Sequence, residues 1–138
     1  MAANWEPGKI RRRAAVRWMR LQHQTGAAVW FNLCQKAVRT ALGAGPGAAS
    51  AKRAWLDSDR DHRRAYNPDR PPPFGVPVYF KMDTPYWHVA LSAGRGKVWT
   101  TDTVRRGRID KVSIGKIEDR WNARCIGWLT HINGRRIW

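Results

Sequence analysis

The sequence predicts an α+β fold, with helices in its first half and a small antiparallel β-sheet in its second half. Up to about residue 65, apolar residues recur three or four positions apart, which is helical spacing. From residue 74 onward, short β-branched and aromatic runs stand between glycine-containing turns. Because helices and strands are segregated along the chain, an α+β layout follows rather than alternating units around a parallel sheet.

Three segments of the first half are expected to be helical. Residues 10–23 carry an apolar stripe, and arginines cover the rest of that helix. The stripe consists of Ala14, Trp18 and Leu21, with Val16 and Met19 nearby. Residues 31–42 form a second helix that a Gly/Ala/Pro loop at 43–50 terminates. Residues 50–65 are helical at least at their start, and the proline-rich residues 66–73 connect to the sheet.

The second half contains the predicted strands. Four apolar runs are separated by turns, and they cover residues 76–80, 87–93, 97–102 and 109–114. Pro77 indicates a strand start or an edge strand, because proline lacks a backbone N–H. Residues 115–121 are expected to form a short helical turn. The last strand or two cover residues 125–130 and 132–138, where Asn133-Gly134 is a hairpin signal.

A chain of 138 residues suits one domain with one modest core. We expect a loose arm at residues 1–9 and a single domain over residues 10–138. A hydrophobic content of 43% and nine tryptophans predict a folded globule. The apolar runs are shorter than the roughly 20 residues of a membrane helix, and the N-terminus lacks the apolar core of a secretion signal. A target outside the cytoplasm would therefore require another route of delivery.

The net charge is +16 at pH 7, and the sequence pI is about 11.3. Such a charge predicts attraction to a polyanion: nucleic acid, an anionic membrane surface or an acidic cell wall. Arginine outnumbers lysine, which suits the recognition of phosphate or carboxylate groups. The alternative is a basic surface that serves only solubility. The basic helix at 10–23 has the same two interpretations, an anionic partner or packing on its own domain.

The first candidate for chemistry is Cys34, near the start of the helix at 31–42. A cysteine on a first helical turn feels the positive end of the helix dipole, which favours the reactive thiolate. The alternative is a small hydrophobic residue packed in the core. Cys125 has an apolar, aromatic setting and is expected to be such a core residue. The two cysteines do not make a disulfide scaffold, the spacing of cysteines and histidines supports no structural zinc, and we expect no cofactor.

A cysteine nucleophile needs a histidine to take its proton and a third polar group to orient that histidine. His88 is the best candidate, because it begins an otherwise apolar strand where a histidine needs a partner. The other histidines, at positions 23, 62 and 131, lie at polar helix ends or in loops, and His62 is expected to be solvated.

The hairpin that follows His88 predicts the third group. A three-residue loop, Gly94-Arg95-Gly96, pairs Ala93 with Lys97 and thereby sets His88 opposite Asp102. Ala90 then faces Thr100. A loop of two or four residues would turn Asp102 to the other face of the sheet. Asp102 either orients the His88 ring or caps the turn that follows it, and Thr100 is the substitute orienter.

The order of these features resembles the papain-like cell-wall cysteine peptidases and amidases. These are the CHAP and NlpC-like families, found in phage lysins, phage tail components and bacterial autolysins. The resemblance covers about residues 12–137. The segments that carry it most specifically are Asn32–Arg39, Pro72–Phe80, His88–Gly94 and Val98–Asp102, with Gly127–Thr130 and Ile132–Gly134 near the end.

The resemblance implies a papain-like fold with Cys34 as nucleophile, His88 as base and Asp102 as orienter. It also implies an oxyanion site made by the cysteine's own backbone N–H and a nearby donor, for which Asn32 is a weak candidate. This chain departs from the families in one position, since Trp87 stands where a glycine usually precedes the histidine. Three tryptophans flank the expected site and either line a groove or pack in the core: Trp30, Trp87 and Trp99.

The expected function is therefore the hydrolysis of bacterial peptidoglycan, by cleavage of a peptide or amide bond of its stem peptides. The expected setting is a virion or the host cytoplasm, with delivery to the cell wall, as a free lysin or a tail component beside other virion proteins. The basic surface would contact anionic polymers. The alternative is a catalytically inert, basic virion structural or nucleic-acid-binding module on the same fold, although no helix-turn-helix, RNA-recognition or zinc-finger pattern supports it.

Overall fold

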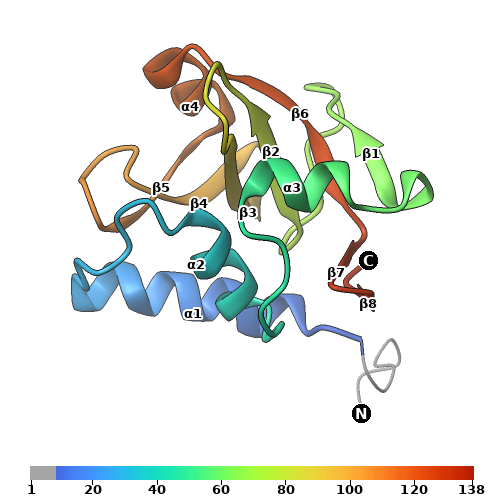
Figure 1. The fold of residues 1–138 in the computed structure, drawn as a ribbon. Helices are drawn as coiled ribbons and strands as arrows, with labels where there is room; N and C mark the ends of the chain where they lie inside the picture. The colour runs from blue at the N-terminus through green and yellow to red at the C-terminus, as the bar shows by residue number, and fades with distance from the viewer. Residues whose placement is uncertain (1–8) are drawn as a thin grey trace.

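A computed structural model describes residues 9–138, so the expected arm at residues 1–9 lies outside the described part except for Lys9. The fold is α+β, as predicted (Figure 1). Its helices are α1 (Arg12–Thr25), α2 (Cys34–Ala41), α3 (Ala51–Leu56) and α4 (Ile114–Trp121), with a 3-10 turn η1 (Arg60–His62). In the described residues, no helix combines the length and the apolar character needed to cross a membrane.

Six strands form one antiparallel sheet in the order β1-β6-β2-β3-β4-β5. They are β1 (Arg63–Ala65), β2 (Pro77–Lys81), β3 (His88–Gly94), β4 (Lys97–Thr101), β5 (Ile109–Ser113) and β6 (Arg124–Leu129). A separate hairpin joins β7 (His131–Ile132) to β8 (Arg135–Arg136). Asn133 and Gly134 at its tip both have positive φ, 49° and 76°, which confirms the predicted turn.

The sheet separates two apolar clusters, because successive side chains of a strand point to opposite faces. Tyr79 and Leu91 belong to the larger cluster, which α1, α2 and α3 cover. Phe80 and Ala90 belong to the smaller cluster, which α4 covers. Figure 1 shows α1 and α2 side by side on the first face. The Cys34 end of α2 is thereby held against β3, the strand that begins with His88.

Helix α1 has a different buried face from the one predicted. Ala15 and Met19 are its fully buried residues, and Leu21, assigned to the stripe, is 48% exposed. The face is set by packing: Trp18 meets the buried Trp30 edge-on, with ring centroids 5.3 Å apart. Arginines stand on several sides of this helix, so its polar pattern alone does not define the core side. The helix ends at Gly26, whose φ of 68° suits a glycine C-cap.

Helix α2 starts three residues later than predicted, at Cys34 itself. The preceding residues form a turn in which the Leu33 N–H bonds to the Trp30 carbonyl. The buried residues of this segment include Val38, Ala41 and Leu42, which recur at helical spacing. The short strand β1 was not predicted. The sequence indicates a helix at the start of residues 50–65, and the structure ends this helix at Leu56 and places β1 after it.

The β3–β4 hairpin has the predicted register but a different loop. Gly94 pairs with Lys97, which leaves a two-residue turn, and a bulge at Ala93 shifts the register by one residue. Leu91 therefore pairs with Trp99, as in the predicted pairing. The bulge compensates for the shorter loop, so continuing this register still sets His88 level with the residue after β4.

Candidate active site

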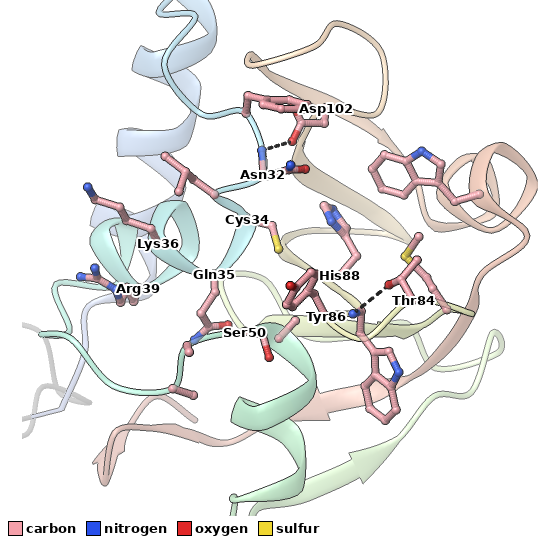
Figure 2. Close-up of a pocket in the computed structure, with 18 of the residues that line it drawn as sticks. Asn32, Cys34, Gln35, Lys36, Arg39, Ser50, Thr84, Tyr86, His88 and Asp102 are labelled. Carbon is pink, nitrogen blue, oxygen red and sulfur yellow. Dashed lines mark hydrogen bonds between the residues drawn. The ribbon is translucent and has the colours of Figure 1, made fainter.

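One cavity of the described residues has a volume of about 970 Å³ and contains Cys34 and His88 in its lining. Its walls come from the start of α2, the start of β3, the segment 82–87 and the end of α4. Figure 2 shows the Cys34 sulfur and the His88 ring pointing into the same space. Two residues 54 positions apart in the chain are thus brought together, as a cysteine–histidine mechanism requires.

Cys34 is the first residue of α2, and its side chain is partly exposed to the cavity. The backbone N–H groups of Val89, Gln35 and Cys34 itself act on the sulfur to lower its pKa. The Val89 contact places it against the residue that follows His88. The first N–H groups of a helix have no partner within the helix, so the sulfur lies among donors able to meet a negative charge.

Burial nevertheless raises the pKa of Cys34 to about 11, and the nearby Asp102 carboxylate adds to the rise. The start of the helix favours the thiolate as predicted, because the backbone N–H groups of Gln35 and Cys34 lower the pKa, but burial outweighs this effect. Removing water from a thiolate at this buried position costs more free energy than stabilisation by the backbone N–H groups provides. At neutral pH the sulfur carries its proton.

His88 is buried and bonded to a hydroxyl group. Its Nε2 lies 2.7 Å from Thr100 Oγ1, and its ring meets the Trp121 ring edge-on at 4.7 Å between centroids. Burial lowers the pKa of His88 to about 3, so the ring is neutral at pH 7. The Cys34 thiol and the His88 imidazole, which line one cavity, are thus both neutral at pH 7.

A chain of threonines orients the His88 ring. Thr100 Oγ1 lies 2.9 Å from Thr103 Oγ1, and Thr103 Oγ1 donates to the Thr101 carbonyl oxygen at 3.3 Å. In the tautomer that carries its proton on Nε2, His88 donates to Thr100, Thr100 to Thr103, and Thr103 to the Thr101 carbonyl oxygen. That tautomer leaves Nδ1 of His88 as the unprotonated, basic nitrogen.

Asp102 does not orient His88, contrary to the first of its two predicted roles. Its backbone has a φ of 65°, which ends β4 and turns the carboxylate toward the loop before α2. There it accepts the backbone N–H of Asn32 at 3.0 Å and that of Gly107 at 2.6 Å. The alternative role, a cap on the turn after β4, is confirmed. Thr100, the substitute orienter, is the residue that contacts the histidine.

No family model, curated protein or solved structure matches this chain. What the cavity does must therefore be argued from its own residues. Within residues 9–138, no group of three or more histidine, cysteine, aspartate or glutamate side chains could hold a metal ion.

The three tryptophans expected near the site divide between core and cavity. Trp30 is buried and donates its indole N–H to the Gln22 side chain, and Trp99 is buried beside His23. Both are core residues. Trp87 lines the cavity, as does Asn32, the proposed oxyanion donor.

The other histidines lie outside the cavity lining. His23 contacts the Asp110 carboxylate at 3.1 Å. His62 is not simply solvated: its ring stacks on that of His131, with centroids 3.6 Å apart. Cys125 is buried, as predicted.

Several residues of the site were not predicted. Gln35 follows the cysteine directly, is 6% exposed, and its Oε1 has no hydrogen-bond partner among the described residues. Thr103 and Trp121 act through His88 by the contacts given above. Adjacency to Cys34 was the only sequence signal for Gln35, and the helical pattern at 115–121 did not indicate which side of α4 faces the histidine.

Proposed function

We propose that this chain is a cysteine peptidase or amidase that cleaves stem peptides of bacterial peptidoglycan. The observation that carries the proposal is the shared cavity of Cys34, at the N-terminus of α2, and His88, at the start of β3. A thiol and a neutral imidazole in one cavity, beside unpaired helical N–H groups, are the parts needed for acyl transfer.

In the proposed reaction, the Cys34 sulfur attacks the carbonyl carbon of the scissile amide while His88 takes the thiol proton. The oxyanion is met by the backbone N–H of Cys34, with the Asn32 side chain as a second donor. Collapse of the tetrahedral intermediate breaks the C–N bond, and His88 protonates the departing amine. Water, deprotonated by His88, then attacks the thioester; the acid leaves and the thiol is restored.

The order of elements also supports a papain-like assignment. A cysteine-bearing helix packs against an antiparallel sheet whose histidine begins the adjacent strand, which is the arrangement that the resemblance implies. The backbone at Trp87 has the conformation expected of the glycine that usually stands there. This residue has a φ of 57°, a backbone conformation that glycine adopts most easily. As a setting we propose a virion or host cytoplasm with delivery to the wall.

The test is digestion of purified peptidoglycan by the purified protein. We expect wild-type protein to release soluble fragments, and Cys34→Ala and His88→Ala to abolish the release. Cys125→Ser removes the other thiol and is the matched control, which should retain activity. Mass spectrometry of the fragments identifies the bond and distinguishes an amidase from an endopeptidase. Full activity in Cys34→Ala would refute the proposal.

The second candidate is the inert, basic binding module. Two observations favour it: the net charge of +16 and the protonated state of the Cys34 thiol. This candidate predicts duplex DNA binding that weakens steeply between 50 and 200 mM salt, together with no peptidoglycan release. Release that depends on Cys34 would exclude it.

A further inference from the structure

Trp87 adopts a backbone conformation that is costly for its side chain. Its φ is 57°, in the left-handed region, where a bulky residue is rare and strained. The segment before Trp87 holds this conformation in place. The Trp87 N–H bonds to Thr84 Oγ1 at 3.3 Å (Figure 2), and the Tyr86 carbonyl accepts the Lys52 N–H at 2.9 Å. Strain of this kind persists where the surroundings enforce it, and it is concentrated at functional sites.

The strained residue stands between two hollows. Trp87 lines the cavity of Cys34 and His88, and it also lines a second, more open hollow of about 600 Å³. Met82 and Thr84 also line both, so the two hollows lie next to each other along this segment. The Trp87 side chain is partly exposed and forms the boundary that a bound chain would cross on leaving the catalytic pair.

Two ammonium groups flank the Trp87 ring. Lys52 Nζ, from α3, lies 5.8 Å from the ring centroid, and Lys81 Nζ, from the end of β2, lies 5.9 Å from it. Neither forms an ion pair with a carboxylate of the described residues. The single carboxylate that lines the second hollow within residues 9–138 is Asp83. A ligand carboxylate at this ring would be attracted by two cations, and repulsion from the one anion would partly offset that attraction.

The linings of the two hollows, taken together, are also predominantly cationic. Among residues 9–138 it includes six cationic side chains and two carboxylates. The cations are Lys36, Arg39, Lys52, Lys81, Arg106 and Arg120, and the carboxylates are Asp83 and Asp102. Asp102 already accepts two backbone N–H bonds. The unpartnered Oε1 of Gln35 adds an acceptor that suits a peptide N–H.

We infer that Trp87, Lys52 and Lys81 form a subsite for a peptide that carries a carboxylate, with the peptide lying over the indole and its carboxylate between the two ammonium groups. The orientation of this peptide toward Cys34 rests on the proposed function. Binding of the peptide to the subsite can be measured without any reaction. Its ligand class is an acidic peptide rather than a neutral one.

The experiment measures binding to Cys34→Ala protein by NMR titration, so that no hydrolysis interferes. The probes are the tetrapeptide L-Ala-γ-D-Glu-L-Lys-D-Ala and its analogue with both carboxylates amidated. We expect the acidic peptide to bind about tenfold more tightly than the amidated one. Lys52→Met and Lys81→Met should each weaken acidic-peptide binding about fivefold and leave the amidated peptide unaffected. Lys116→Met, an exposed lysine outside both linings, is the matched control.

Trp87 itself is tested with three variants. Trp87→Phe should retain most of the binding, whereas Trp87→Ala and Trp87→Gly should both lose about tenfold. The glycine variant should melt about 4 °C above the alanine variant, because glycine adopts the left-handed conformation without strain. This difference in melting temperature measures the cost of the strained backbone separately from the effect of losing the indole ring.

Equal affinity for the two peptides, or lysine variants that behave like Lys116→Met, would overturn the inference. So would unchanged binding in Trp87→Ala. Selective binding without any peptidoglycan release by the wild-type protein would support the subsite and refute the proposed hydrolase. If wild-type protein releases peptidoglycan fragments but shows no preference for the acidic peptide, the proposed hydrolase is supported and the subsite is refuted.

Discussion

Acid should destabilise this protein through His88. The unfolded chain protonates this residue below about pH 6.5, whereas burial lowers its pKa in the folded chain to about 3. Between these values the unfolded state binds the extra proton, so stability falls as the pH falls. The contribution is complete above pH 6.5. The loss amounts to about 2 kcal/mol at pH 5 and about 3 kcal/mol at pH 4.5.

The perturbation that isolates this term is His88→Asn, which removes the titrating ring and retains a polar side chain facing Thr100. Urea unfolding followed by tryptophan fluorescence gives the free energy of unfolding at pH 7 and at pH 5. We expect wild-type protein to lose about 2 kcal/mol more than the variant between these two values. All other side chains are the same in both proteins, so their contributions cancel in the difference.

His131→Asn is the matched control. The pKa of His131 is also lowered, by burial first and then by the neighbouring His62 and Arg136, but this side chain is only partly buried. Its removal should change the acid dependence less than that of His88. Parallel loss of stability in wild-type and His88→Asn protein, within about 0.5 kcal/mol, would refute the conclusion that His88 is held neutral by burial.

Three further predictions concern the same cavity. Thr100→Val should lower the unfolding free energy by about 1–2 kcal/mol and remove the Nε2–H tautomer of His88 from the ¹⁵N NMR spectrum. Thr100→Ser should restore both the stability and the tautomer. An unchanged tautomer in the valine variant would count against the threonine chain. In Cys125→Ser protein, the iodoacetamide reaction of Cys34 should accelerate about tenfold per pH unit up to its pKa of about 11, and a plateau near pH 8 would contradict this. Asp102→Ala removes the acceptor of two backbone N–H groups, so we expect a loss of about 2 kcal/mol and faster hydrogen exchange at those two amides, while unchanged exchange would show that the cap is dispensable.

Local signals explain why much of the site could be located from the chain alone. Helical spacing and the following glycines place Cys34 on a first turn, and an apolar run places His88 at the head of a strand. Even the register between β3 and β4 was predictable from the glycine turn, although a bulge at Ala93 achieves it with a shorter loop. These features depend on residues close together in sequence.

The partner of His88 could not be predicted in the same way. Register sets Asp102 level with the histidine, but the left-handed backbone at Asp102 redirects its carboxylate to amides at positions 32 and 107. That conformation arises where the loop after β4 meets the entry to α2. A contact between segments 70 residues apart has no local pattern to reveal it.

The same division holds for the chemistry. The residue types and their order along the chain are enough to predict an α+β domain with a cysteine, a histidine and a basic surface. Only the tertiary structure sets how these groups ionise, because burial opposes charge on Cys34 and His88 more strongly than their local sequence favours it. Packing likewise decides which tryptophan reaches the cavity, since Trp30 and Trp99 are enclosed by the core and Trp87 is not.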